Sequence, residues 1–147
     1  MSNAKPANRR KARQLLVQAL YSWLITGSDL IDIETHFYME NDMKEVDRDY
    51  FKELLYAVPK QRSTLEATFQ PYLDRTVEEL DPISKAILCL STYELTERPD
   101  VPYKVVINEG VNLAKMFGPT DAYKFINGVL DQVAASTRAV EVAAQRR

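Results

Sequence analysis

The chain has 147 residues and a net charge of −2. Apolar residues make up 46% of it, which is enough for one buried core in a single domain. Four glycines are too few for a fold with many tight turns, so the composition favours helices. Neither a membrane-spanning apolar run nor a signal peptide is present, and one cysteine allows no intrachain disulfide or cysteine-based zinc site. We therefore expect a cytoplasmic protein with no membrane partner and no cofactor.

The first predicted element is a flexible basic arm over residues 1–8. Residues 1–28 carry five basic residues and no acid, for +5, and the other 14 basic and 21 acidic residues sum to −7. The five are Lys5, Arg9, Arg10, Lys11 and Arg13. Such a split suggests an anionic partner, with nucleic acid as the leading candidate. A solvated basic tail is the alternative.

A first helix is predicted from about Arg9 to Ile25, with Asn8 as its cap and Gly27 as its end. At about 100° per residue, one face collects the apolar side chains expected in the core. These are Ala12, Leu15, Leu16, Ala19 and Trp23. The opposite face is a basic stripe with an outward aromatic side chain. It consists of Arg10, Arg13, Gln14, Val17 and Tyr21.

The middle of the chain predicts three further helical segments. One begins at Asp29 or Asp32 and ends near Met39. Another is capped by Asp47 and interrupted by Pro59, with a buried face of Tyr50, Phe51, Leu54, Leu55 and Val58. After Pro71 and a short turn over 77–80, Asp81 caps a third helix with proline at its first position.

The C-terminal part predicts two helices after a rigid connector over 98–102, where two prolines fix the backbone. The first helix runs from about Tyr103 to Phe117 and stops at Gly118. The last is capped by Thr120 or Asp121 and ends near Ala135. Residues 136–147 have little apolar periodicity, so we expect a frayed tail after a single domain over 9–135.

The residue types needed for catalysis are missing. His36 is the only histidine, Cys89 lies in an apolar run where cysteine behaves as a small hydrophobe, and the four glycines are scattered. Glu78 and Glu79 are adjacent and so diverge around a helix. The sequence therefore predicts that the protein is not an enzyme and has no metal site.

The remaining features are those of a binding protein. Arginine matches the geometry of phosphate, and aromatic rings stack on unpaired bases; the first helix has both. The start of the last helix is a second candidate, because exposed backbone N–H groups near Asp121 favour anions and Lys124 adds a positive charge. Phe125, at the rim of that helix's apolar face, is either a core residue or a base-stacking ring.

Several motifs, in order, resemble the NusB family over about residues 5–135. They are Arg9-Arg10-Lys11-Ala12-Arg13, Val17-Gln18-Ala19-Leu20-Tyr21-Ser22-Trp23, Tyr93-Glu94-Leu95, Asp100-Val101-Pro102-Tyr103-Lys104-Val105-Val106-Ile107-Asn108-Glu109 and Lys124-Phe125-Ile126-Asn127-Gly128-Val129-Leu130-Asp131. The structural interpretation of the last motif is that Gly128 lets its helix approach a neighbour closely. The resemblance implies an all-α fold of about seven helices in two small subbundles.

The resemblance also implies a non-catalytic transcription antitermination factor. Its partners would be boxA RNA in nascent ribosomal RNA, the ribosomal protein NusE and the RNA polymerase antitermination complex. The implied RNA-binding residues are Lys5, Arg9, Arg10, Arg13, Tyr21, Asp121, Lys124 and Phe125. The implied NusE-binding residues are Tyr21, Arg75, Glu78 and Glu79, and Ser84 stands where the family has an acidic residue near that partner.

Three other functions fit parts of the sequence. A helical protein–protein scaffold would leave the basic arm as a solvated tail and would not bind RNA. A helix-turn-helix DNA-binding protein needs a basic recognition helix after a short turn, whereas the basic residues here stand at the start of the first helix. The RNA-binding extension of an RNA methyltransferase would need a glycine-rich cofactor-binding region, which this sequence lacks.

Overall fold

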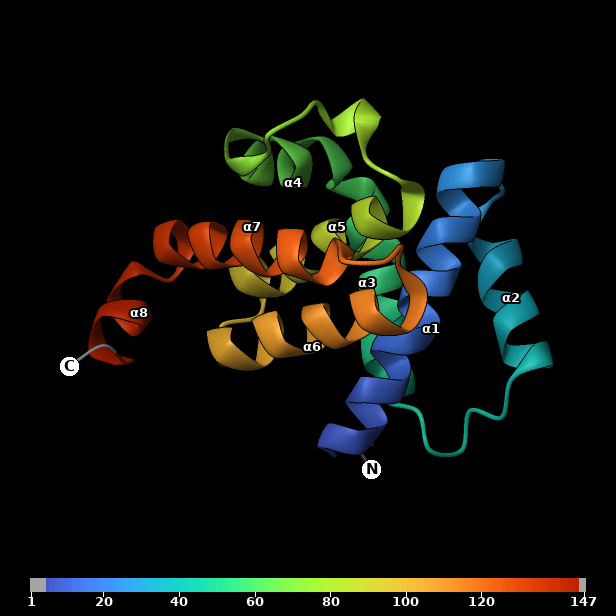
Figure 1. The fold of residues 1–147 in the computed structure, drawn as a ribbon. Helices are drawn as coiled ribbons and strands as arrows, with labels where there is room; N and C mark the ends of the chain where they lie inside the picture. Colours follow the sequence, from blue (N-terminus) through green and yellow to red (C-terminus); the bar gives the residue numbers. More distant parts are fainter. Residues whose placement is uncertain (1–4, 146–147) are drawn as a thin grey trace. The chain divides into compact units, whose positions relative to one another are not determined.

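The computed structural model describes residues 5–145, and within them it contains helices and no strand (Figure 1). The helices are α1 (Pro6–Thr26), α2 (Leu30–Glu40), α3 (Arg48–Lys60), α4 (Arg62–Phe69), α5 (Pro82–Glu97), α6 (Tyr103–Phe117), α7 (Ala122–Thr137) and α8 (Ala139–Gln145), with 3-10 turns η1 (Gln70–Tyr72) and η2 (Val77–Glu79). The all-α prediction is confirmed. The described helices exceed the expected seven by one, which is α8. No helix among the described residues is both long and apolar enough to cross a membrane.

Contacts divide the chain into two compact units, one ending at Gln61 and the other beginning at Arg62. The division agrees with the two small subbundles that the family resemblance implies. The prediction of one domain over 9–135 stays a prediction.

The first unit packs α1 against both α2 and α3. α1 begins at Pro6, earlier than predicted, because proline suits the first helical position, where the backbone N–H has no helical partner. Residues 6–8, expected in a flexible arm, therefore form its first turn, and residues 1–4 of that arm lie outside the described part. The predicted end is confirmed: Gly27 has φ 65°, the left-handed conformation that glycine adopts without strain.

α3 follows its sequence prediction closely. The Asp47 carboxylate accepts a hydrogen bond from the Tyr50 backbone N–H at 3.1 Å, as a capping residue should. All five apolar residues predicted for its inner face are buried. Pro59 lies in the last turn, and α3 ends one residue later at Lys60. The predicted interruption is confirmed, since α4 begins only at Arg62.

The second unit packs α5, α6 and α7 against one another, with α4 on α5 and α8 on α7. The Asp81 carboxylate caps α5 by accepting a hydrogen bond from the Ser84 backbone N–H at 2.9 Å, and Pro82 occupies the first helical position as predicted. The middle of α5 is buried on all sides, from Ala86 to Leu95. α5 is therefore the central helix of this unit.

The glycine that lets helices approach closely in the second unit is Gly110 of α6, and the sequence prediction that assigned this role to Gly128 is wrong. A Cβ at Gly110 would lie 2.9 Å from both Leu130 Cδ1 of α7 and Ser91 Oγ of α5. A Cβ at Gly128 would meet nothing within 4 Å. Gly128 faces open space because the inner face of α7 is formed by neighbouring positions such as Val129 and Leu130.

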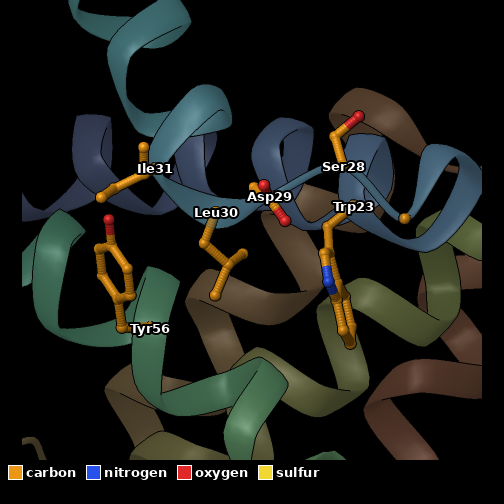
Figure 2. A pocket seen from close by; sticks show the side chains of 7 residues that line it. Trp23, Ser28, Asp29, Leu30, Ile31 and Tyr56 are labelled. Atoms are coloured by element: carbon orange, nitrogen blue, oxygen red, sulfur yellow. The ribbon is translucent and has the colours of Figure 1, made fainter.

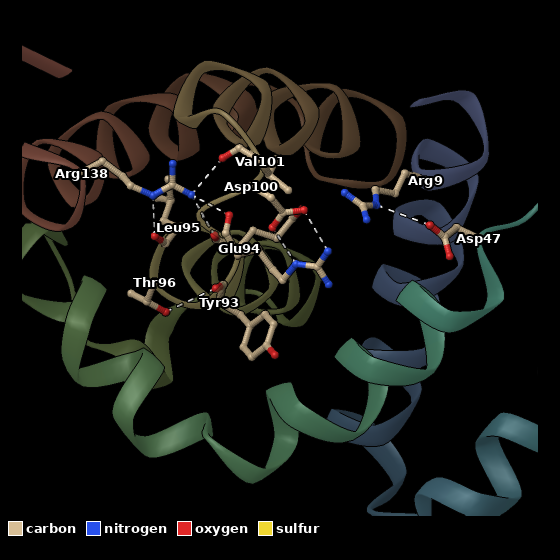
Figure 3. Close-up of polar contacts among 10 residues, drawn as sticks. Arg9, Asp47, Tyr93, Glu94, Leu95, Thr96, Asp100, Val101 and Arg138 are labelled. Atoms are coloured by element: carbon tan, nitrogen blue, oxygen red, sulfur yellow. Dashed lines mark hydrogen bonds and ion pairs between the residues drawn. The ribbon is translucent and has the colours of Figure 1, made fainter. Parts of the chain in front are cut away.

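The connector between α5 and α6 is closed by Arg138, which follows α7 (Figure 3). Its guanidinium donates hydrogen bonds to the backbone carbonyls of Leu95, Glu94, Arg98 and Val101 at 2.8, 3.2, 2.9 and 2.9 Å. It also donates to the Glu141 carboxylate, which accepts the Tyr103 backbone N–H at the start of α6. That backbone hydrogen bond, with Arg138, lowers the pKa of Glu141.

The frayed tail expected after Ser136 is replaced by structure. α7 continues to Thr137 and α8 covers Ala139–Gln145. Apolar periodicity could not predict this, because Arg138 and Glu141 hold the segment through polar contacts, and Val142 is its one buried apolar side chain among the described residues. Residues 146–147 of the predicted tail lie outside the described part.

Candidate functional site

The candidate residues belong to two clusters, one in each unit. The N-terminal basic cluster consists of Lys5, Arg9, Arg10, Lys11 and Arg13 at the start of α1. The α7 cluster consists of Arg75, Lys115, Asp121, Tyr123, Lys124 and Phe125 in the second unit. The other candidates are Tyr21 of α1 in the first unit, and Glu78 and Glu79 of η2, which follow Arg75 in the second unit.

The exposed cations of the N-terminal basic cluster lie just before α1 and in its first two turns. Lys5 precedes α1 at its N-cap position, and its side chain and that of Arg10 are exposed. Lys11 forms an ion pair with Glu45 at 2.9 Å, and both side chains are largely in solvent. Such an exposed pair contributes little to stability, so another anion can displace Glu45. This edge of the first unit therefore offers positive charge to an anionic ligand.

Arg9 and Arg13 have a different environment, because both pack on Tyr50 of α3. Their guanidinium carbons lie 4.2 and 5.6 Å from the centre of the Tyr50 ring. Arg9 also lies 3.5 Å from the carboxylate of Asp47, the residue that caps α3 (Figure 3). A cation over an aromatic face is attracted by the ring, and more strongly when water is excluded. These two arginines therefore tie α1 to α3.

The predicted outward stripe of α1 is wrong at two positions. Arg13 is 3% exposed and Val17 is fully buried, whereas Tyr21 is 39% exposed as predicted. The opposite face is also wrong in part, since Leu15 and Trp23 are half-buried and Leu20 is buried. A helical projection identifies one apolar stripe but cannot show how many neighbours cover the helix. The burial of Arg13 depends on a tyrosine in another helix.

The start of α7 has an unusual backbone. Asp121 is at the predicted N-cap position but has φ 68°, and its side chain makes no capping hydrogen bond. Asparagine and aspartate tolerate this left-handed conformation better than most residues. The Asp121 carboxylate instead lies 3.7 Å from the Lys124 Nζ, and both side chains are two-thirds exposed. The sequence therefore predicted the N-cap position of α7 correctly, but the Asp121 side chain faces Lys124 and does not cap the helix.

Phe125 is half-buried and covered by Arg75, whose guanidinium carbon lies 4.6 Å from the ring centre. The sequence assigned Phe125 to RNA and Arg75 to a protein partner, and the structure brings the two side chains together. Arg75 also pairs with Asp74 at 2.8 Å, which lowers the pKa of that carboxyl group. The Phe125 ring is thus neither fully buried nor fully accessible. Arg75 must move away before a base can stack on the face that it covers.

Sequence reasoning missed Tyr123 and Lys115. The half-buried Tyr123 ring has the Lys115 Nζ at 4.9 Å and the Lys124 Nζ at 5.9 Å from its centre. The signal available in the sequence was an aromatic residue directly before Lys124. Lys115 lies in the preceding helix, so only the fold shows that it joins this group.

The acidic candidates differ in how free their carboxylates are. Glu78 is exposed, whereas Glu79 accepts hydrogen bonds from the backbone N–H and hydroxyl of Thr76, each at 2.9 Å. These bonds lower the pKa of Glu79, so it is ionised at neutral pH and fixed to its own turn. Ser84 is buried under the α5 cap, so its hydroxyl is not a surface group that replaces an exposed acid.

The residues that could support chemistry do not come together. No group of three or more histidine, cysteine, aspartate or glutamate side chains in residues 5–145 could hold a metal ion. Burial raises the pKa of the Cys89 thiol to about 12, which leaves it protonated and unreactive at neutral pH. His36 is exposed and makes an edge contact with Phe37. The described arrangement supports binding by charge and aromatic rings.

Comparison with known proteins identifies the fold. The model of the NusB family matches residues 10–135. The transcription antitermination protein NusB of Pseudoalteromonas atlantica is 54% identical over 138 residues, covering 94% of this chain and 99% of its own. That of Alcanivorax borkumensis is 51% identical over 141 residues, covering 96% and 94%.

Solved structures give the same result. T. maritima NusB has a TM-score of 0.73 at 26% identity, over 86% of this chain and 89% of its own. A chain in a structure described as a plectonemic RNA supercoil has a TM-score of 0.79 at 21% identity, over 86% and 94%, which shows a likeness of fold.

Proposed function

The chain belongs to the NusB family, and on that basis we propose that it is a transcription antitermination factor that binds boxA-type single-stranded RNA. The observation that carries the proposal beyond family membership is the concentration of exposed cations at the start of α1 in a chain of net charge −2. Phosphate contacts supply most of the affinity of such binding, and stacked bases supply preference.

Within this proposal the candidate residues have separate roles. Lys5 and Arg10 contact phosphates directly, and Arg9 does so from its half-buried position beside Asp47. Arg13 supports them from beneath by holding Tyr50, and does not itself contact RNA. Lys124 supplies charge at the second cluster, with Asp121 orienting it. Arg75 leaves the ring of Phe125 when a base stacks there.

We further propose that the protein is non-catalytic, acts in the cytoplasm, and binds RNA together with NusE in the RNA polymerase antitermination complex. Tyr21, Arg75 and Glu78 are the exposed side chains suited to contact NusE. Glu79 contributes indirectly, because its carboxylate holds the turn that carries Arg75 and Glu78. Joint binding would raise RNA affinity by adding contacts from the partner.

A helical scaffold without RNA binding is the second candidate. The observation in its favour is that Arg9 and Arg13, two of the five cations, contact Tyr50 and so have a structural role. Under that function, the exposed Lys5 and Arg10 would not contact RNA. The two functions differ in one measurable property, which is sequence-specific RNA affinity.

The test is a titration of a boxA-like RNA and a scrambled RNA, each with and without NusE. Specific binding that NusE strengthens supports the proposal. In the Lys5→Ala, Arg10→Ala double variant, the log–log salt slope should fall by about 1.4, since each lost phosphate contact contributes about 0.7. Lys52→Ala with Lys60→Ala removes two exposed cations of α3 outside the N-terminal basic cluster and should leave the slope unchanged. Equal binding of both RNAs, with an unchanged slope in the first variant, supports the scaffold.

A further inference from the structure

A cleft of about 510 Å³ lies in the first unit, between the end of α1, the start of α2 and Tyr56 of α3 (Figure 2). Its lining includes Trp23, Asp29, Leu30 and Ile31. None of the residues assigned to RNA or NusE lines it. The cleft is therefore a separate feature of the surface and does not depend on the proposed function.

The apolar side of the cleft is unusually exposed. Ile31 is 66% exposed, and Leu30 and the Tyr56 ring beside it are half-buried. Figure 2 shows these three side chains at one end of the cleft, with the Trp23 indole at the other end. Aliphatic and aromatic side chains gathered around an open hollow are typical of binding surfaces. This end suits a branched aliphatic side chain.

The charged side of the cleft is acidic. Residues 14–43 contain five acids and no lysine or arginine. Asp29 lies between Leu30 and Trp23 in Figure 2, is exposed, and accepts no capping hydrogen bond although it occupies the N-cap position of α2. Asp32 follows in the first turn and is also exposed. The Asp29 charge favours a cation at this end of the cleft, and Asp32 adds negative charge in the first turn of α2 without lining the cleft.

The other charged groups nearby do not cancel this preference. The Glu34 carboxylate accepts hydrogen bonds from the Tyr38 and Tyr56 hydroxyls at 2.7 and 2.6 Å, and the charges of Lys52 and Arg48 of α3 act on this carboxylate; neither cation lines the cleft. Lys60 stands at the far end of α3 and does not line the cleft. Among the lining residues the charge is that of Asp29 alone.

We propose that this cleft docks a short segment of a partner protein in which an arginine stands next to a branched aliphatic side chain. The aliphatic side chain packs against Leu30, Ile31 and Tyr56. The guanidinium pairs with Asp29 and stacks on the Trp23 indole. Arginine fits better than lysine because its planar group can hold a carboxylate with two hydrogen bonds and stack on an aromatic face at the same time.

Trp23 is the only tryptophan of the chain, so its fluorescence reports directly on the cleft. The probes are a short synthetic peptide with adjacent leucine and arginine, a second with glutamine for arginine, and a third with serine for leucine. The leucine–arginine peptide should shift the Trp23 emission, and the shift should reach a plateau as the peptide concentration rises. The glutamine peptide should bind about 5-fold more weakly and the serine peptide about 10-fold more weakly, as expected for one surface ion pair and one buried aliphatic group.

Two matched variants locate the site on the full-length protein. Ile31→Lys adds a positive charge and removes the apolar contact, and should weaken the leucine–arginine peptide at least about 10-fold. Met39→Lys makes the same kind of change on the same helix, at a residue that is 79% exposed and outside the lining, and should leave binding unchanged. Asp29→Asn should reduce the preference for arginine over glutamine. Circular dichroism checks that all three variants are folded.

The proposal is overturned if the leucine–arginine peptide causes no saturable change, or if the glutamine peptide binds equally well. It is also overturned if Met39→Lys weakens binding as much as Ile31→Lys. A Trp23 emission that changes with protein concentration, with a doubled mass in solution, would identify a second copy as the occupant instead. A shift caused by boxA RNA and lost in Ile31→Lys would assign the cleft to RNA. RNA binding that persists in Ile31→Lys leaves the proposed function intact whatever the peptides do.

Discussion

Gly110 offers the sharpest test of the packing in the second unit. In Gly110→Ala the new Cβ would lie 2.9 Å from Leu130 Cδ1 and from Ser91 Oγ, against an ordinary contact of about 3.5–4.0 Å. Both neighbours are buried, so neither can turn into solvent. Overpacking of this kind costs about 1–3 kcal/mol. The helix gains about 1 kcal/mol from replacing an interior glycine by alanine, so the net effect is a loss of about 0–2 kcal/mol.

Gly128→Ala is the matched control, because it has the same gain in helix propensity and nothing within 4 Å to displace. It should raise the free energy of unfolding by about 0.5–1 kcal/mol. The difference between the two variants in urea unfolding is then the overpacking cost alone. Adding Ser91→Ala to Gly110→Ala removes one of the two close contacts and should recover part of the loss. Equal stabilisation by both alanines would refute the close approach at Gly110.

Three further predictions concern other contacts. Phe125→Ala should cost about 1–2 kcal/mol of unfolding free energy, less than the 3–5 kcal/mol of a fully buried phenylalanine, and should weaken RNA binding by about 1–3 kcal/mol. Arg138→Met should cost about 2–6 kcal/mol in urea unfolding, because it leaves the Leu95 and Val101 carbonyls without their guanidinium donor at about 1–3 kcal/mol each, whereas the Glu94 and Arg98 carbonyls keep backbone N–H donors. Burial and the hydrogen bond to Glu34 raise the pKa of Tyr38 to about 12, and the Glu34 hydrogen bond with burial does the same for Tyr56. Both pKa values lie above the ordinary 10.0 of tyrosine. The two hydroxyl hydrogen bonds to Glu34 therefore contribute their full stability below about pH 10 and lose it as the pH rises through about 12.

Each of these has an outcome that would contradict it. A loss of 3–5 kcal/mol in Phe125→Ala with unchanged RNA affinity would make Phe125 a core residue only. An Arg138→Met variant as stable as the parent would mean that water replaces the guanidinium. For the tyrosines, unfolding free energy is measured between about pH 9 and pH 12 in the parent and in the double phenylalanine variant. Identical pH profiles would show that Glu34 does not hold the two hydroxyl groups.

Local signals in the sequence were sufficient for most of the helix ends. The caps at Asp47 and Asp81 and the stop at Gly27 each depend on a residue's own backbone and its nearest neighbours, and all three are confirmed. The start of α1 was missed although Pro6 was visible, because Asn8 is also a good capping residue. Where two local signals compete, the sequence does not show which of them prevails.

The failures concern properties that depend on distant parts of the chain. Arg13 is buried because Tyr50, 37 positions later, supplies an aromatic face for it. Gly110 and Gly128 look alike in the sequence, and only the packing of α6 between α5 and α7 distinguishes them. The same limit applies to the site: charge and aromatic content predicted the candidate residues, but not that Arg75 covers Phe125 or that Lys115 flanks Tyr123. Their roles in binding stay predictions.

Arg138 has a practical consequence for how this protein is shortened. The family match ends at residue 135, so a boundary chosen by similarity alone would remove the guanidinium three residues later. Such a truncation would keep every motif that carries the family resemblance and still remove the guanidinium donor from the α5–α6 connector. In a shortened protein the connector should then become accessible to proteases and exchange its amide protons sooner than the rest of the second unit. The second unit therefore extends at least to Arg138, because this residue supplies the donor for buried carbonyls although it lies beyond the end of the family match.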